Sequence, residues 1–86
     1  MLILQEEQVQ TCQVKLNKEH RAIPGFIYVN RLFIPIESQE FYDWETVIPE
    51  YKRWLLEENV FCVILQQSEC YSIWCFAPRT AKINNR

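Results

Sequence analysis

Cysteine and histidine are the residue types in this chain that could attack a substrate or hold a metal ion. The sequence contains four cysteines (Cys12, Cys62, Cys70 and Cys75) and one histidine, His20. A structural zinc site normally uses closely spaced ligand pairs such as Cys-x-x-Cys, and these spacings contain none. We therefore expect no metal site, and we expect the cysteines to be reduced thiols that pack as small apolar residues.

The sequence also lacks the other common signatures of catalysis. A single glycine is too few for a phosphate-binding loop or a dinucleotide fingerprint. The acidic pairs Glu6-Glu7 and Glu57-Glu58 adjoin along the chain, and nothing in their spacing places two carboxylates across a substrate. We expect no catalytic activity and no cofactor.

Length and composition define the class of protein. Eighty-six residues correspond to a single domain, residues 1–86, and 49% hydrophobic with 14% aromatic residues is typical of a globular chain. A net charge of −2 makes nucleic acid an unlikely partner. The apolar run at the N-terminus is too short for a signal peptide, and no segment is long enough to span a membrane. These features predict a cytoplasmic protein with no membrane partner.

The first half of the chain has the patterns of strands. Residues 9–16 alternate between apolar and polar side chains, which predicts a strand, and the polar residues 17–21 predict a loop. Residues 23–26, Ile-Pro-Gly-Phe, match a type II turn. Residues 26–36 are rich in β-branched and aromatic side chains. They fit one long strand or a hairpin that turns at Asn30-Arg31, and the hairpin is favoured.

The period changes to that of a helix over residues 38–58. Apolar side chains recur at helical spacing (Phe41, Trp44, Ile48, Tyr51 and Leu55), with Ser38 as a candidate N-cap and Asn59 as a stop. We expect Trp44 and Tyr51 to be core residues. Pro49 should break or kink this segment. Either a short helix ends near Glu45 and a second begins at Thr46, or one helix bends.

Residues 60–66 and 71–77 predict a hairpin with Ser68 and Glu69 as its loop. In that register Cys62 faces Cys75, Val63 faces Trp74 and Ile64 faces Ile73. Both faces of the hairpin are then apolar, as in strands that are covered on both sides. Since the sequence offers one helical segment, the second face needs another cover: the N-terminal residues, a wrapped sheet or another copy of the chain. Pro78 ends the hairpin, and residues 79–86 are expected to be a flexible tail.

Together these patterns predict an α+β fold, an antiparallel sheet of four or five strands with one helical segment on one face, in the order β-β(-β)-α-β-β. The expected function is that of a small protein-binding or regulatory domain that forms a homodimer. Its possible interaction surface comprises Trp54, Ile64, Tyr71 and Ile73. The alternative is a nucleic-acid-binding module in which Tyr28 and Phe33 stack on bases beside Arg31 and Arg79.

Overall fold

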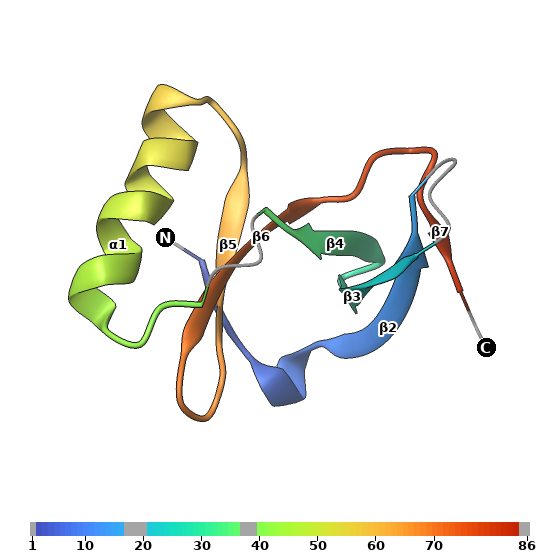
Figure 1. Cartoon of the computed structure of the whole chain (residues 1–86), viewed down its shortest axis with the longest axis horizontal. Coiled ribbons are helices and arrows are strands. Elements are labelled where there is room, and N and C mark those ends of the chain that lie inside the picture. The colour runs from blue at the N-terminus through green and yellow to red at the C-terminus, as the bar shows by residue number, and fades with distance from the viewer. Residues whose placement is uncertain (1, 17–20, 37–39, 85–86) are drawn as a thin grey trace.

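The computed structural model describes residues 2–16, 21–36 and 40–84 of the chain. Within them, seven strands form one sheet and one α-helix packs beside it (Figure 1). The strands are β1 (Ile3–Gln5), β2 (Gln10–Lys15), β3 (Ala22–Tyr28), β4 (Arg31–Pro35), β5 (Cys62–Gln66), β6 (Tyr71–Phe76) and β7 (Lys82–Ile83). A 3-10 turn, η1 (Glu6–Gln8), joins β1 to β2, and the helix α1 (Trp44–Lys52) continues into a π-helical turn, η2 (Arg53–Glu57).

The sheet has the order β1-β5-β6-β4-β3-β2-β7, so the α+β class is confirmed while the number of strands is larger than predicted. All neighbouring strands are antiparallel except β1 and β5, which are parallel. The two additional strands, β1 and β7, lie at the edges of the sheet. They have three and two residues, too few to show a period in the sequence.

The β5–β6 hairpin has the predicted register. Cys62 lies opposite Cys75, Val63 opposite Trp74 and Ile64 opposite Ile73. The loop is closed by the Gln67 N–H, which donates to the Cys70 carbonyl oxygen at 2.8 Å. The hairpin therefore has the two apolar faces that the sequence implied.

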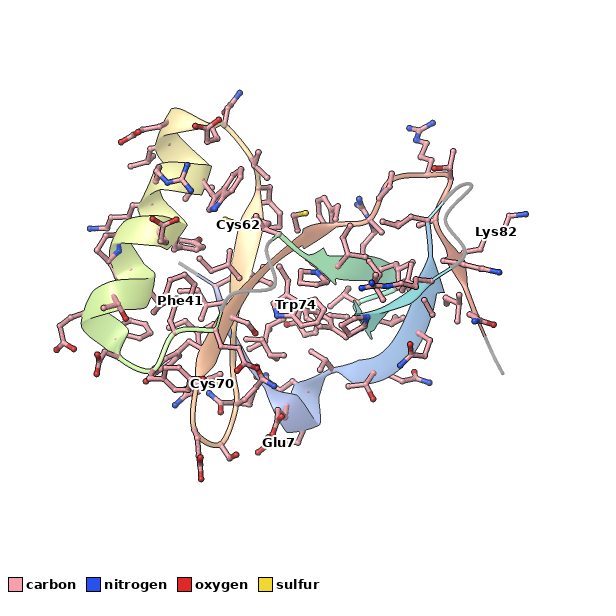
Figure 2. All side chains as sticks on the ribbon, in the orientation of Figure 1. Glu7, Phe41, Cys62, Cys70, Trp74 and Lys82 are labelled. Carbon is pink, nitrogen blue, oxygen red and sulfur yellow. The ribbon has the colours of Figure 1, made fainter. Side chains whose placement is uncertain are left out.

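Both faces of this hairpin are covered within the single chain. On one face, Cys62, Ile64 and Ile73 pack beneath Val47 and Tyr51 of the helix. On the other, a second core cluster forms because the sheet curls over itself; its buried members are Leu4, Phe26, Phe33, Val63, Leu65 and Trp74. Figure 2 shows Trp74 among the side chains that fill this curl. Of the three covers that the sequence left open for the second face, the wrapped sheet and the N-terminal strand are the two observed.

A row of aromatic rings crosses the inside of the curl. The rings belong to Phe26 on β3, Phe33 on β4, Phe76 on β6 and Phe61, which comes just before β5. Successive ring centroids are 5.0 Å apart. The row begins at Phe26, which is fully buried, and ends at Phe61, which is 48% exposed. It links the core to the surface at one end of the sheet.

The helix begins later than predicted. Its N-cap is Asp43, since Phe41 forms a β-bridge with Tyr71 instead of a helical turn. The candidate N-cap Ser38 lies outside the described residues. Trp44 is 38% exposed and meets Tyr71 edge-on at 5.5 Å, so its assignment to the core is wrong, whereas Tyr51 is buried as expected.

Pro49 does not break the helix, which is continuous from Trp44 to Lys52. Proline removes the hydrogen bond to the carbonyl of Glu45, and both residues are exposed, so water can replace that bond. The helical turns end as predicted at Asn59, which has a φ of 59°. There the Glu58 N–H donates to the Arg53 carbonyl oxygen at 3.0 Å, one residue further back than in an α-helix.

The hairpin predicted within residues 26–36 is confirmed, although its loop is Val29-Asn30 and not Asn30-Arg31. Both loop residues have positive φ, 49° and 61°, as a type I′ turn requires. The predicted type II turn at residues 23–26 is wrong, because Gly25 lies inside β3 with a φ outside the positive range.

The C-terminal segment joins the sheet. Lys82 and Ile83 pair with β2, and the Asn84 N–H donates to the Gln13 carbonyl oxygen at 2.8 Å. These residues were expected to belong to a flexible tail. The described residues contain no helix that is long and apolar enough to cross a membrane.

Candidate binding cleft

The sheet divides where β3 and β4 stop pairing. The two strands are paired from Tyr28–Arg31 to Phe26–Phe33. Beyond that point Ala22 to Gly25 of β3 pair with β2 alone. Ile34 and Pro35 of β4 pair with β6 alone. One end of the curl is therefore open between two strand edges.

Two prolines explain this division. Continuing the register of the hairpin would bring Pro24 and Pro35 opposite each other, two residues beyond Phe26 and Phe33. Antiparallel strands alternate between pairs that exchange hydrogen bonds and pairs that do not, and the pair beside the two-residue loop is bonded. Pro24 and Pro35 would form a bonded pair, yet neither has an N–H to donate. Their carbonyl oxygens remain on the two edges that face the opening.

The opening leads into a cleft of about 670 Å³. Its lining is mainly apolar and comes from strands β2 to β6 and the segments that adjoin them. The apolar and aromatic members are Val9, Ile23, Pro24, Phe26, Pro35, Ile36, Leu65 and Trp74. A concave, largely apolar site of this size with a few polar groups is the usual form of a ligand pocket.

The polar groups at the floor of the cleft form a short hydrogen-bonded chain. The indole Nε1–H of Trp74 donates to Ser72 Oγ at 2.7 Å, and that hydroxyl donates to Gln67 Oε1 at 3.0 Å. The Cys70 thiol donates to the same oxygen at 3.6 Å. Among the described residues, the amide nitrogen of Gln67 makes no hydrogen bond, so its two N–H donors are free to meet a ligand.

Carboxylates gather at the mouth of the cleft. Glu6 and Glu40 line it, and Arg21 is the basic residue that lines it with them. The charges of these acids also affect the thiol of Cys70. Burial raises the pKa of its thiol most, and the charges of Glu40, Glu6 and Glu69 raise that pKa further. None of these three carboxylates forms an ion pair with a described residue.

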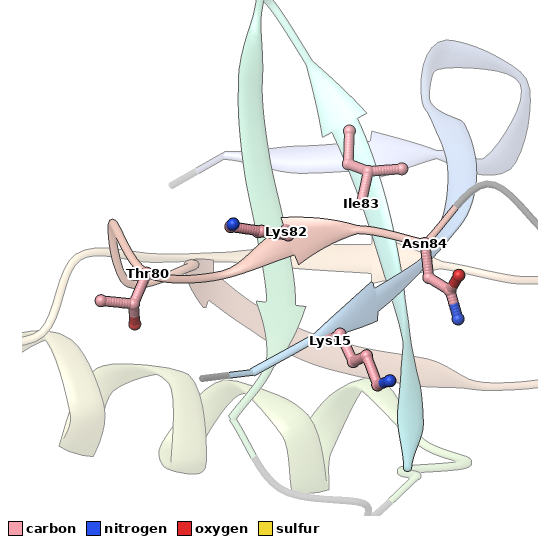
Figure 3. Close-up of a pocket in the computed structure, with 5 residues that line it drawn as sticks. All are labelled: Lys15, Thr80, Lys82, Ile83 and Asn84. Carbon is pink, nitrogen blue, oxygen red and sulfur yellow. The ribbon is translucent and has the colours of Figure 1, made fainter. Parts of the chain in front are cut away.

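A second hollow lies at the β2–β7 edge and is less suited to a ligand. It measures about 510 Å³ and is lined by Lys15, Thr80, Lys82, Ile83 and Asn84. Lys15 and Lys82 are directly paired across the two strands, an arrangement in which like charges repel. Figure 3 shows their side chains extending in opposite directions. Because the two ammonium groups do not converge, this hollow has no focus for an anion.

The predicted interaction surface is divided by the structure. Ile64 and Ile73 are buried beneath the helix and cannot meet another molecule in this arrangement. Tyr71 and Trp54 are half-buried and border the same core cluster, and the Arg53 guanidinium lies 4.7 Å from the centre of the Trp54 ring. The four residues therefore do not form one exposed patch.

The residues proposed for base stacking are not displayed for that purpose. Phe33 is buried and Tyr28 is half-buried against the core. The Arg31 guanidinium lies 3.7 Å from the centre of the Phe76 ring, so it covers an aromatic face that a base would need. Arg79 is exposed.

The four cysteines are free thiols in the structure. Burial raises the pKa of Cys62 to about 11, and the neighbouring Cys75 adds to that rise. Burial also raises the pKa of Cys12, which lines the cleft. No group of three metal-ligating side chains occurs among the residues described, and His20 lies outside them.

Sequence reasoning missed the cleft, although it contained one cue. Pro24 and Pro35 are equally distant from the loop Val29-Asn30, so placing the hairpin correctly also places the prolines opposite each other.

No family model, curated protein or solved structure matches this chain.

Proposed function

We propose that this protein is a small, non-catalytic binding domain whose cleft receives an extended segment of a protein partner. The observation that carries the proposal is the separation of β3 and β4 above an apolar floor. Separated strand edges offer backbone acceptors to an extended chain, and apolar pockets between them select its side chains. The cleft has both features in one place.

The chemistry of the cleft supports binding over catalysis. A cysteine nucleophile needs a lowered pKa, and burial shifts the pKa of Cys12 in the opposite direction. The hydroxyl of Ser72 is held between Trp74 and Gln67 and has no base beside it. The described lining residues thus provide contacts for a ligand and no activated nucleophile.

Self-association and a cytoplasmic location are further parts of the proposal that rest on the sequence. The argument for a homodimer is weaker than the sequence suggested, because both faces of the β5–β6 hairpin are covered within one chain. Light scattering tests it directly: a folded species of 10.4 kDa at high concentration contradicts the dimer.

A pair of variants on one strand tests the cleft. Thr11 and Gln10 are both exposed residues of β2, and Thr11 lines the cleft whereas Gln10 does not. Thr11→Trp should therefore fill the cleft, while Gln10→Trp places the same ring at a neighbouring position that does not line it.

The assay is selection of short peptides from a random display library on the wild-type domain, followed by measurement of their affinities for both variants. We expect peptides that bind the wild type and the Gln10 variant alike and lose at least about tenfold in affinity for the Thr11 variant, about 1.4 kcal/mol. Failure to enrich any peptide, or equal binding to both variants, contradicts the proposal.

A further inference from the structure

The cleft presents hydrogen-bond acceptors on its two strand edges and at its mouth. The carbonyl oxygens of Pro24 and Pro35 face the opening because the prolines leave the two edges unpaired. The carboxylates of Glu6 and Glu40 stand at the mouth. A ligand must supply donors to these groups, since a desolvated acceptor without a partner costs free energy.

The acceptors at the mouth are charged carboxylates. Glu6 comes from η1 and Glu40 precedes the Phe41 bridge, so two separate parts of the chain bring carboxylates to the mouth. Arg21 offsets one of these charges. The described residues at this mouth therefore have a net negative charge, and a cationic group is the complementary partner.

From this complementarity we infer that the segment bound in the cleft is basic and carries an arginine or lysine side chain at the acidic mouth beside apolar residues that enter the floor. This inference rests on the proposed function. Arginine fits best, because its planar guanidinium has five N–H donors that can bind a carboxylate and a carbonyl at once. The amide nitrogen of Gln67 can donate to a backbone carbonyl of the same segment.

The test compares three sets of short synthetic peptides with the same apolar residues. The sets differ at two polar positions: both are arginine in the first set, glutamine in the second and glutamate in the third. Binding is followed by NMR through the backbone amide of Gly25 and the indole N–H of Trp74, because both residues line the cleft. We expect the arginine set to bind about tenfold more tightly than the glutamine set, and the glutamate set to bind most weakly. Added salt should reduce the advantage of arginine.

Charge-neutralising variants locate the source of this preference. The double variant Glu6→Gln/Glu40→Gln should abolish the preference for arginine while the glutamine set binds as before. The matched control is Glu45→Gln/Glu57→Gln, which removes one exposed carboxylate from α1 and one from η2. Neither Glu45 nor Glu57 lines the cleft. This control should retain the preference.

The outcomes separate the inference from the function on which it rests. Equal binding of all three sets at the cleft, or a preference that survives in the Glu6/Glu40 variant, overturns the basic partner and leaves the binding function intact. Absence of binding by every set overturns both.

Discussion

Gly25 provides the sharpest test of how the curled sheet is packed. A Cβ atom on this residue would overlap Cγ2 of Val14, which is fully buried, and would lie 3.1 Å from the carbonyl oxygen of Phe33. The φ angle of Gly25 is not positive, so any L-residue could adopt its backbone conformation. The glycine is therefore required for the close approach of β2 and β4 to β3.

The expected effect of Gly25→Ala follows from two opposing contributions. Overpacking a core by one methyl group costs about 1–3 kcal/mol. Alanine also restricts the unfolded chain, which returns about 0.4–1 kcal/mol. The midpoints of these ranges give a net loss of about 1.3 kcal/mol, a decrease of roughly 5–10 °C in Tm for a domain of this size.

A double-mutant cycle with Val14→Ala identifies the cause. Val14→Ala alone should destabilise by about 2–3 kcal/mol, since it empties a buried site. In that background the alanine at position 25 has room, so the two changes should couple favourably by about 1–2 kcal/mol. Urea unfolding followed by tryptophan fluorescence measures all four proteins. A neutral Gly25→Ala would show that no glycine is required at this position. A costly Gly25→Ala whose loss adds to that of Val14→Ala in the double variant would refute the steric explanation and favour a backbone requirement.

Three further predictions follow from burial and pKa. Trp44→Ala should cost about 1–2 kcal/mol and Val47→Ala about 2–3 kcal/mol in the same titration, because Trp44 is partly exposed and Val47 is fully buried; the reverse order would place the helix incorrectly. Phe33→Ala should cost about 3–5 kcal/mol and Phe61→Ala at most about 1.5, since the two rings occupy the buried and exposed parts of one row; equal losses would contradict that row. Denatured, unreduced protein should contain four free thiols, and in the native state Cys62 should react with iodoacetamide last at pH 8, because a pKa of about 11 leaves little thiolate below that pH; rapid labelling of Cys62 would show that its site opens.

The β5–β6 hairpin could be predicted to the residue because its signals are local. Short apolar runs rich in β-branched and aromatic residues define both strands, and the polar loop Ser68-Glu69 fixes which residues face each other. The same reasoning identified the hairpin at residues 26–36, although a valine with positive φ could not be anticipated, since β-branched residues rarely adopt it.

The missed features depend on contacts between distant segments. β1 is defined by its partner β5, and β7 by its partner β2; neither has enough residues to reveal itself by pattern. Phe41 fits the helical spacing in sequence, yet a bridge to Tyr71 holds it in extended form. The cleft is also a tertiary feature, because it arises from two strands that diverge to different neighbours.

The parallel pairing of β1 with β5 has a consequence for the order of folding. The side-chain amide of Gln5 donates to Gln66, 61 residues along the chain, at 2.9 Å. The β3–β4 and β5–β6 hairpins close short loops, whereas β1 can dock only after most of the chain has been arranged. Until then Leu65 lacks its partner Leu4, and the second core cluster remains open to water. The N-terminal strand is thus expected to form after the two hairpins and to detach before they open.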